Sequence, residues 1–512
     1  MMMFLIALSP ILWLIVALSV LHISAWKACS LALLISLAMG LGIEGMTAVH
    51  AVQSVLEGVA LAVWPILLVI IAAIFTYNLT LHTHGMDVIK KILTSVSNDR
   101  RVLILLIGWG FGGFLEGMAG FGTAVAIPAG MLAGIGVNPV LAAAVCLVAN
   151  SVPTAYGSIG IPIVTLANVT GFDPMQLSGY TALQLTPLIV LCPFVMTVVA
   201  GGGLHALRDM LPICLAASFG FLLPELAVAF AVGPELAVVA GSIGAMAAIV
   251  ATAHLVHVDN PEYALPPHDS EAPVTPHDGL IAWLPFILIF LFLLFTSKLV
   301  PPVHDTLNLV KTSVLIYDGE GGAPYTFVWV ATPGVLIFLA AFIGGHVQGA
   351  GLGEMVHVLL KTVRNLRFTI ITIITVIATA KVMGYSGMTH QIAETAVAAT
   401  GTGYPFIASF IGSIGTFITG SATSSCVLFG KLQTDSAIAI GASSAAQAWM
   451  AAANATGACA GKMISPQTIA IAVAAIGVGG VDGKLLHFAV KVYLPFVVIM
   501  GLIVYFGAGM LG

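Results

Sequence analysis

Residues 112–123 read Gly-Gly-Phe-Leu-Glu-Gly-Met-Ala-Gly-Phe-Gly-Thr. Gly117, Gly120 and Gly122 disfavour one long uninterrupted helix, because glycine loses the most conformational freedom on ordering. A helical hairpin that enters a membrane and turns back fits the pattern better. Irregular backbone at membrane depth is tolerated only where it faces protein or a water-filled cavity. The free amide groups of such a tip, beside helix N-termini, favour binding of an anion.

The overall composition places this stretch in a bilayer. Hydrophobic residues make up 59% of the 512 residues and charged residues only 7%, with a mean hydropathy of +1.10. Soluble domains carry roughly 25% charged residues, so this chain has too little charge to cover a water-exposed surface. The apolar stretch 1–21 has neither a basic start nor a clear cleavage site, so we expect a first span that is retained. The net charge of −5 is thinly spread, and no basic patch indicates a nucleic-acid partner.

Apolar runs of the length of a bilayer predict an all-α polytopic membrane protein. By length we expect about 12–14 spanning or half-spanning helices, with inverted repeats and re-entrant hairpins. An acidic, proline-containing stretch at 257–279 is interpreted as a linker. It would join an N-terminal membrane half, 1–256, to a C-terminal half, 280–512. A further polar loop is expected at 301–325.

Basic residues indicate which loops face the cytoplasm. They cluster at 83–101 and on an amphipathic helix expected at 354–367. Placing both clusters in the cytoplasm puts Lys27 there as well and the N-terminus outside. The same topology puts the 301–325 loop outside and the linker inside.

Two segments of the chain resemble each other. The matching pairs are Gly112 and Gly415, Phe114 and Phe417, Gly117 and Gly420, Ala119 and Ala422, and, after one inserted residue, Asn150 and Asn454, Gly157 and Gly461, and Pro162 and Pro466. A basic loop precedes the first copy, whereas the equivalent loop at 389–403 has no Lys or Arg, so the charge rule places the two loops on opposite sides. This predicts an inverted repeat, a frequent plan of secondary transporters. Two unrelated Gly-rich packing regions are the alternative.

The repeat indicates where a substrate would bind. The second tip, Thr-Gly-Ser-Ala-Thr-Ser-Ser at 419–425, adds hydroxyl groups. Each copy continues into a span that we expect to be broken near its middle, by Pro153 in the first and by Gly457 and Gly461 in the second. Polar side chains at the breaks can hydrogen-bond a carboxylate and a neighbouring hydroxyl, or simply join helices. The expected substrate-binding residues are Gly117, Gly120, Gly122, Thr123, Asn150, Ser151, Thr154, Gly420, Ser421, Thr423, Ser424, Ser425, Asn454, Thr456 and Lys462.

Charged side chains inside apolar runs are costly and mark functional sites by default. Glu116, in the first hairpin, is our candidate for a proton-coupling carboxyl, because loss of water favours its neutral form. Lys462 adjoins Gly461 and is a candidate to meet a substrate carboxylate. Lys381 and Lys431 are less favoured candidates. A snorkelling side chain or a structural ion pair is the alternative for all four charges.

The remaining ionisable and reactive residues give no sign of an enzyme. Glu57, Glu225 and Glu235 are expected near the membrane interfaces. The six cysteines show neither metal nor disulfide spacing. We find no Walker loop, dinucleotide fingerprint or paired-histidine motif. No cofactor or metal is therefore expected, and transport would draw on an ion gradient or run passively.

At these residues the chain resembles the lactate permease family, secondary carriers of L-lactate, D-lactate and glycolate. The resemblance rests on residues 113–129, 149–160 and 419–425 and covers nearly the full length. It implies a bacterial inner-membrane symporter of 2-hydroxymonocarboxylates and protons, driven by the proton gradient. A fold-level likeness of the family to carriers with paired hairpins implies an elevator-like motion. The oligomeric state is left open between monomer and homodimer.

Two other classes of function remain open at this point. A passive small-anion channel would line its pore with rings of charge or hydroxyl groups, which the repeat can supply. An intramembrane enzyme ranks last, since only Glu116 and scattered histidines favour it.

Overall fold

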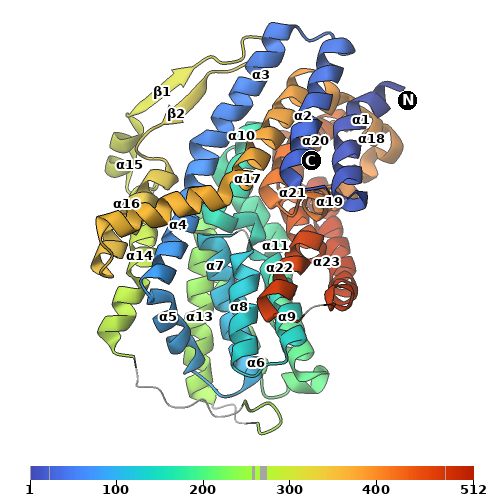
Figure 1. Ribbon diagram of the computed structural model, residues 1–512. Helices are drawn as coiled ribbons and strands as arrows, with labels where there is room; N and C mark the ends of the chain where they lie inside the picture. The colour runs from blue at the N-terminus through green and yellow to red at the C-terminus, as the bar shows by residue number, and fades with distance from the viewer. Residues whose placement is uncertain (1, 22, 121, 257–259, 266–273, 479) are drawn as a thin grey trace.

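The computed structural model describes residues 2–21, 23–120, 122–256, 260–265, 274–478 and 480–512, and these form a helical bundle (Figure 1). Ten of its helices are long and apolar enough to cross a membrane, or up to twelve if each of two bent helix pairs is one span. The predicted all-α polytopic membrane protein is therefore confirmed. Shorter apolar helices account for the half-spanning elements that the sequence also indicated.

Up to residue 256 the named elements of the described chain are all helices. They are α1 (Met2–Ile15), η1 (Val16–Val20), α2 (Ala25–Gly42), α3 (Ala48–Leu61), η2 (Ala62–Leu67), α4 (Leu68–His82), α5 (Gly85–Thr94), α6 (Arg100–Leu103), η3 (Ile104–Phe111), α7 (Gly112–Met118), α8 (Thr123–Gly134), α9 (Pro139–Ser151), η4 (Pro153–Tyr156), α10 (Gly157–Thr170), α11 (Pro174–Gly201), η5 (Leu204–Leu207), α12 (Leu211–Ala231) and α13 (Ala237–Val256).

After the linker the chain adds one short β-hairpin to its helices. The elements are α14 (Pro276–Phe295), α15 (Pro301–Asn308), β1 (Lys311–Val314), β2 (Tyr325–Val328), α16 (Pro333–Val347), α17 (Leu352–Tyr385), α18 (Met388–Thr400), η6 (Gly401–Gly403), α19 (Tyr404–Thr419), α20 (Ala422–Ala439), α21 (Ser444–Ile464), α22 (Pro466–Ile476) and α23 (Asp482–Leu511).

Two helical hairpins reach toward each other inside the bundle. Helices α7 and α8 form the first, and α19 and α20 form the second. In Figure 1 the first hairpin, with α6, lies in the lower half of the molecule and α20 lies in the upper half. Gly120, Gly122 and Gly420 turn the chain at the tips with φ of +61°, +86° and +68°. Only glycine adopts these left-handed angles at little cost.

Each hairpin is followed by a bent helix pair. Helix α9 meets η4 and α10 at 59°, and α21 meets α22 at 46°. The first break falls at Pro153, where the sequence predicts it. The second falls at Ser465, so the predicted break at Gly457 and Gly461 is wrong, and α21 runs through both glycines. These two glycines instead let α21 approach α19, in the manner of small residues at membrane helix contacts.

We expect Gly457→Ala to separate α19 from α21. A Cβ atom at Gly457 would overlap the backbone carbonyl of Ser409, and backbone yields less readily than a flexible side chain. Overpacking of this kind costs about 1–3 kcal/mol. Thermal unfolding in detergent measures the loss. Gly483→Ala on α23 is the matched control, because a Cβ there meets nothing within 4 Å, and equal unfolding temperatures for the two variants would contradict this account of the packing.

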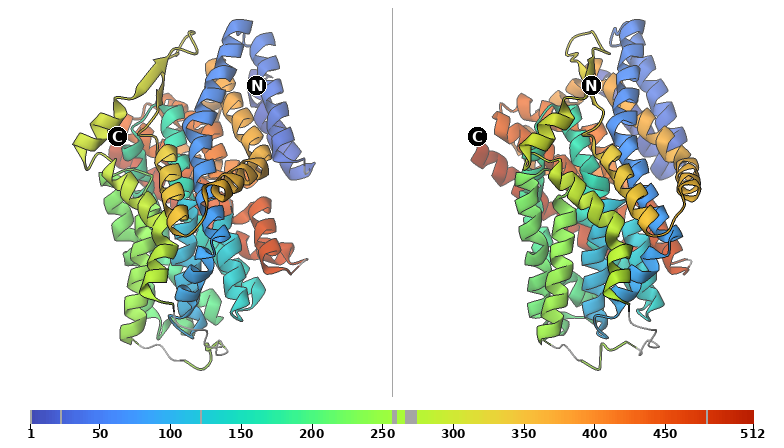
Figure 2. Two further views of the ribbon diagram at one scale, coloured as in Figure 1. Left: turned by 60° about the vertical axis from the view of Figure 1, so that its left-hand side comes forward. Right: turned by 90° about the vertical axis from the view of Figure 1, so that its left-hand side faces the viewer.

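The β-hairpin and the described part of the linker, residues 260–265, lie at opposite ends of the bundle in every view (Figures 1 and 2). The polar loop predicted at 301–325 contains α15 and β1, and β1 pairs antiparallel with β2. Part of the predicted linker, 257–259 and 266–273, lies outside the described residues. Its described part adds an antiparallel bridge between Ala264 and Asp99. Opposite ends agree with the topology expected from the distribution of basic residues.

Candidate functional site

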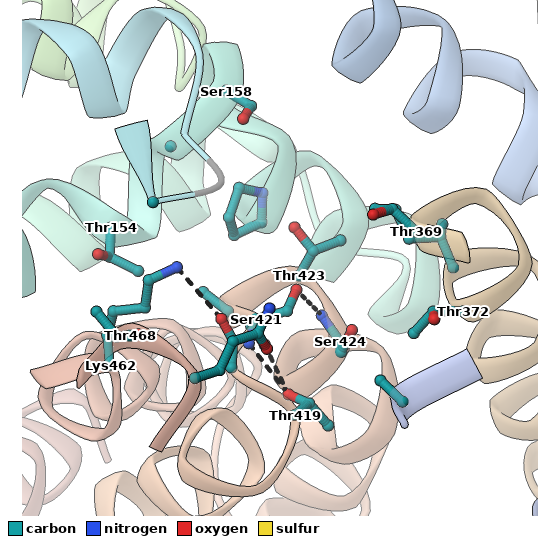
Figure 3. Close-up of a pocket in the computed structure, with 18 of the residues that line it drawn as sticks. Thr154, Ser158, Thr369, Thr372, Thr419, Ser421, Thr423, Ser424, Lys462 and Thr468 are labelled. Carbon is teal, nitrogen blue, oxygen red and sulfur yellow. Dashed lines mark hydrogen bonds between the residues drawn. The ribbon is translucent and has the colours of Figure 1, made fainter. Parts of the chain in front are cut away.

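The tips of the two hairpins meet at a cavity of about 460 Å³ (Figure 3). Its walls come from both hairpins, the broken spans α10, α21 and α22, and the neighbouring helices α2 and α17. The polar residues that line it are Ser24, Glu116, Thr154, Ser158, Thr369, Thr372, Thr419, Ser421, Thr423, Ser424, Lys462, Gln467 and Thr468.

The cavity brings together part of the predicted site. The predicted residues that line it are Glu116, Gly122, Thr154, Gly420, Ser421, Thr423, Ser424 and Lys462. The predicted residues that lie outside its lining are Gly117, Gly120, Thr123, Asn150, Ser151, Ser425, Asn454 and Thr456.

Three of these outlying residues join helices to one another. Ser425 Oγ donates to the carbonyl of Gly412 at 2.7 Å, and Thr456 Oγ1 donates to Gln184 Oε1 at 2.9 Å. Asn454 Nδ2 donates to Ser425 Oγ at 3.4 Å. Their hydrogen bonds connect α19, α20, α21 and α11, which is the alternative role that the sequence left open.

Other outlying residues shape the first hairpin and its neighbours. Thr123 Oγ1 donates to the carbonyl of Gly120 at 2.7 Å across the tip. Ser151 Oγ donates to a carbonyl of its own helix. Gly117, which the sequence pairs with the tip residue Gly420, lies inside α7, where a Cβ would be 3.0 Å from Val239. Its small size therefore serves the contact between α7 and α13.

The second tip presents a helix N-terminus and hydroxyl groups to the cavity. Ser421 caps α20 by accepting a hydrogen bond from the amide of Ser424 at 3.2 Å. The hydroxyls of Thr423, Ser424 and Thr468 border the cavity and make no side-chain hydrogen bond to any described residue. A helix N-terminus with free hydroxyl donors around it favours a bound anion.

Lys462 extends its amine across the cavity toward the same tip (Figure 3). Its Nζ donates to the carbonyl of Gly420 at 3.3 Å, and its side chain is largely buried. Glu116 lies on the wall formed by the first hairpin, within electrostatic range of Lys462. Glu116 Oε2 makes no hydrogen bond to any described residue. The cavity therefore holds one buried amine, one buried carboxyl and several free hydroxyls.

A strained turn holds the first tip in place. Ser158 and Ile159 have φ of 47° and 59°, which is unfavourable for side chains and most of all for a β-branched one. Such residues cost about 1–3 kcal/mol each and persist where their surroundings fix them. Ser158 Oγ donates to the carbonyl of Ala119 at 2.8 Å, and Gly160 abuts the backbone of Pro234. The strain therefore lies directly beside the cavity.

Several lining residues were missed by sequence reasoning. Gln467 and Thr468 follow Pro466, which marks the second break, so the proline was an available signal. Ser24 immediately precedes α2, and Thr369 and Thr372 lie on α17. Neither segment carries a motif that would bring it to the hairpins.

Lys381 and Lys431 lie away from this cavity. Lys381 Nζ pairs with Glu57 Oε1 at 2.6 Å, and Lys431 Nζ pairs with Asp435 Oδ1 at 2.7 Å. Both lysines border a second cavity of about 1230 Å³, toward the end of the bundle that carries the β-hairpin. Glu57 and Glu225, which the sequence analysis expects near the membrane interfaces, both have side chains buried among the helices of the bundle. Lys381 pairs with Glu57, whereas no cation among the described residues accompanies Glu225.

A polytopic helical bundle whose hairpin tips and broken spans meet at a cavity lined by polar side chains is typical of a membrane transporter of small solutes. Residues 3–511 match the family model described as L-lactate permease. The chain belongs to the L-lactate permease family, a family of transporters and not of enzymes.

Individual relatives agree with this assignment. An L-lactate permease of Streptococcus iniae is 44% identical over 84% of this chain and 90% of its own length. The glycolate permease GlcA of Escherichia coli is 33% identical over 98% and 94%. An L-lactate permease of Escherichia coli is 32% identical over the same shares. Among solved structures, MtrF of Neisseria gonorrhoeae aligns with a TM-score of 0.47 at 14% identity, covering 90% of this chain and 84% of that one, which is too distant to support an argument.

Proposed function

We propose that this protein carries L-lactate and related 2-hydroxymonocarboxylates, including D-lactate and glycolate, across the bacterial inner membrane in symport with protons. The names of its relatives supply the class of substrate. The observation that carries the proposal is the meeting of Lys462, the N-terminus of α20 and Glu116 at one cavity.

The cavity suits a small carboxylate with a neighbouring hydroxyl. The carboxylate would bind the amine of Lys462 and the amide groups at the start of α20, because both present positive charge. The hydroxyls of Thr423, Ser424 and Thr468 are free to bond the remaining oxygen atoms and the 2-hydroxyl. A hydrogen-bonded 2-hydroxyl is a strong basis for selection, because an analogue without it leaves buried polar groups unpaired.

Glu116 supplies the coupling to protons in this proposal. A substrate carboxylate entering the cavity would face the carboxyl of Glu116, and two like charges at short range in a buried site repel strongly. A proton on Glu116 removes the repulsion. Substrate and proton therefore favour each other's binding, which is the thermodynamic basis of symport.

Alternating access would be completed by movement of the hairpins against their neighbours. Along α20 the first cavity reaches Ser424 and the second begins at Val427, so about one helical turn separates them. Helix α17 borders both cavities, at Thr372 and at Lys381. We propose that the hairpins and broken spans slide past α17 and α2 in an elevator-like motion, which would expose the bound substrate to the second cavity.

Glu116→Gln is expected to uncouple lactate from protons. Glutamine keeps the shape and hydrogen-bonding capacity of a neutral carboxyl but carries no exchangeable acid proton, so exchange of internal for external lactate should persist. Accumulation of lactate driven by a pH gradient across reconstituted vesicles should fall at least tenfold. Glu394→Gln, at an exposed position of α18, is the control. Full gradient-driven accumulation by Glu116→Gln would remove Glu116 from the mechanism.

A further inference from the structure

Glu225 is a buried carboxyl for which the binding cavity gives no role. It lies on α12, its side chain is 0% exposed, and neither carboxyl oxygen has a hydrogen-bond partner among the described residues. It does not line the cavity at the hairpin tips. A carboxylate without partners in an apolar environment is so costly that such groups take up a proton instead. An ionisable residue at membrane depth is a functional candidate for this reason.

The elements packed around Glu225 bring no compensating cation. Gly241 on α13 faces it, and a Cβ at Gly241 would be 3.1 Å from the Cβ of Glu225. Tyr156 of η4 and Cys459 of α21 are the ionisable side chains within electrostatic range. No Lys, Arg or His of the described chain acts on it. A purely structural carboxyl would be expected to have at least one partner, because half-satisfied buried polar groups cost stability.

The surroundings of Glu225 are continuous with those of Glu116. Cys459 is within electrostatic range of both carboxyls. Tyr156, which is within range of Glu225, precedes Gly157, and a Cβ at Gly157 would be 2.7 Å from Glu116 Oε1. Both carboxyls therefore lie around η4, with Cys459 within electrostatic range of each.

Other unbonded polar atoms lie along the same interface. The hydroxyls of Ser178 and Ser242 have no hydrogen-bond partner among the described residues, and the amide of Asn150 lies beside the carboxyl of Glu116. Tyr156 Oη donates to the carbonyl of Ser178 at 2.6 Å. Buried polar atoms of this kind are where proteins hold ordered water. A chain of water and hydroxyl groups is a route for protons between two carboxyls.

We propose that Glu225 is a second proton-carrying carboxyl of the transport cycle, which exchanges its proton with Glu116 through hydroxyl groups and bridging water. The proposal rests on the proton coupling proposed above. A protonated Glu225 gives its proton to an ionised Glu116, which leaves Glu225 ionised until a proton from water replaces the one it gave. No other reactant is needed.

In this proposal, Glu235 forms the outer end of the route. It lies on the connection from α12 to α13 and borders the second cavity, and Gly160, which follows the strained residues, abuts its backbone amide. Loss of water around it raises the pKa of the Glu235 carboxyl to about 7, although Lys298 acts in the opposite direction. Glu235 therefore holds a proton below about pH 7 and loses it above, so it can exchange protons with the second cavity near neutrality.

The test separates exchange of lactate from movement of protons. Wild type, Glu225→Gln and Ser218→Ala are reconstituted in vesicles, and two quantities are measured in each: exchange of internal for external lactate, and alkalinisation of the medium when lactate is added. Ser218 is a buried residue of the same helix that donates to the carbonyl of Val190 and serves as the matched control. We expect the rate of lactate exchange by Glu225→Gln to stay within about twofold of the wild-type rate. Its lactate-driven proton movement should be at least tenfold lower than that of the wild type.

Each outcome decides between the proposals. Proton movement by Glu225→Gln equal to that of wild type and Ser218→Ala overturns the role of Glu225 and leaves the symport intact. Absence of lactate-driven proton movement in the wild type itself overturns the symport instead. Glu225→Met, whose side chain suits the apolar surroundings, is measured alongside. It must also show exchange near the wild-type rate with reduced proton movement, so the test does not depend on correct folding of the glutamine variant.

Discussion

Lactate uptake by Lys462→Met is expected to show an apparent affinity roughly 30–150-fold weaker than that of the wild type. The amine of Lys462 is the one cation among the described residues that line the cavity at the hairpin tips. A hydrogen bond from a charged group contributes about 2–3 kcal/mol when both partners are withdrawn from water, and 1.4 kcal/mol corresponds to a factor of ten. Methionine keeps the length and apolar stem of the side chain, so the loss reports the charge.

The measurement is the concentration dependence of lactate exchange in reconstituted vesicles. Lys484→Met is the control, because Lys484 is an exposed lysine of α23 and does not line either cavity. Equal apparent affinities in Lys462→Met and wild type would show that the carboxylate binds elsewhere, and the assignment of the binding cavity would fail.

Arg101→Ala is expected to lower the free energy of unfolding by about 3–5 kcal/mol. Arg101 is fully buried, and its guanidinium donates to Asp99 and Asp209, each at 2.7 Å. It also lies 3.8 Å from the ring centre of Tyr263 in the described part of the linker. Alanine would leave the buried carboxylate of Asp99 without its cation and detach the start of α6 from the α11–α12 connection. Loss of a partner from a buried ion pair costs more than the pair itself contributes.

Thermal unfolding in detergent measures this loss, and Lys298→Ala is its control. Lys298 pairs with Asp173 at 3.8 Å with both side chains more than half exposed, and such pairs contribute at most about 1 kcal/mol. Similar unfolding temperatures for the two variants would contradict the structural role of Arg101.

The dependence on pH follows from Asp209. Hydrogen bonds from Arg101 hold the pKa of Asp209 below its ordinary value of 3.8. A carboxyl whose pKa is lowered on folding stabilises the protein at pH values above its ordinary pKa. This stabilisation is lost as the pH falls through the lowered pKa. Wild type and Arg101→Ala should therefore differ in their free energy of unfolding at neutral pH. The share of this difference that comes from Asp209 should decline only below about pH 3.8.

The sequence predicts the hairpins well because their signal is local. Gly120, Gly122 and Gly420 take left-handed angles that other residues avoid, and Pro153 breaks its span where the missing amide requires it. The same reasoning fails at Gly457 and Gly461, because a glycine in a helix marks either a break or a close contact. The partner helix α19 decides between the two, and it lies about forty to fifty residues earlier in the chain.

The site was predicted only in part for a similar reason. A charge within an apolar run is visible in the sequence, and this identified Glu116 and Lys462 as candidates, both of which line the cavity. The direction of a side chain on a helix depends on which helix packs beside it. Asn454 and Thr456 therefore point toward neighbouring helices, whereas Thr372 of α17 reaches the cavity without any motif of its own.

Proton-coupled transport through the cavity at the hairpin tips is most directly tested by lactate uptake into vesicles of the purified protein with and without an imposed pH gradient. For a symport of one proton with one lactate anion, we expect accumulation to rise roughly tenfold for each pH unit of gradient, since one unit corresponds to about 1.4 kcal/mol. The rate should saturate with lactate concentration. Uptake that does not change with the pH gradient would contradict the account. So would a flux that rises with lactate concentration without saturating, as in a channel.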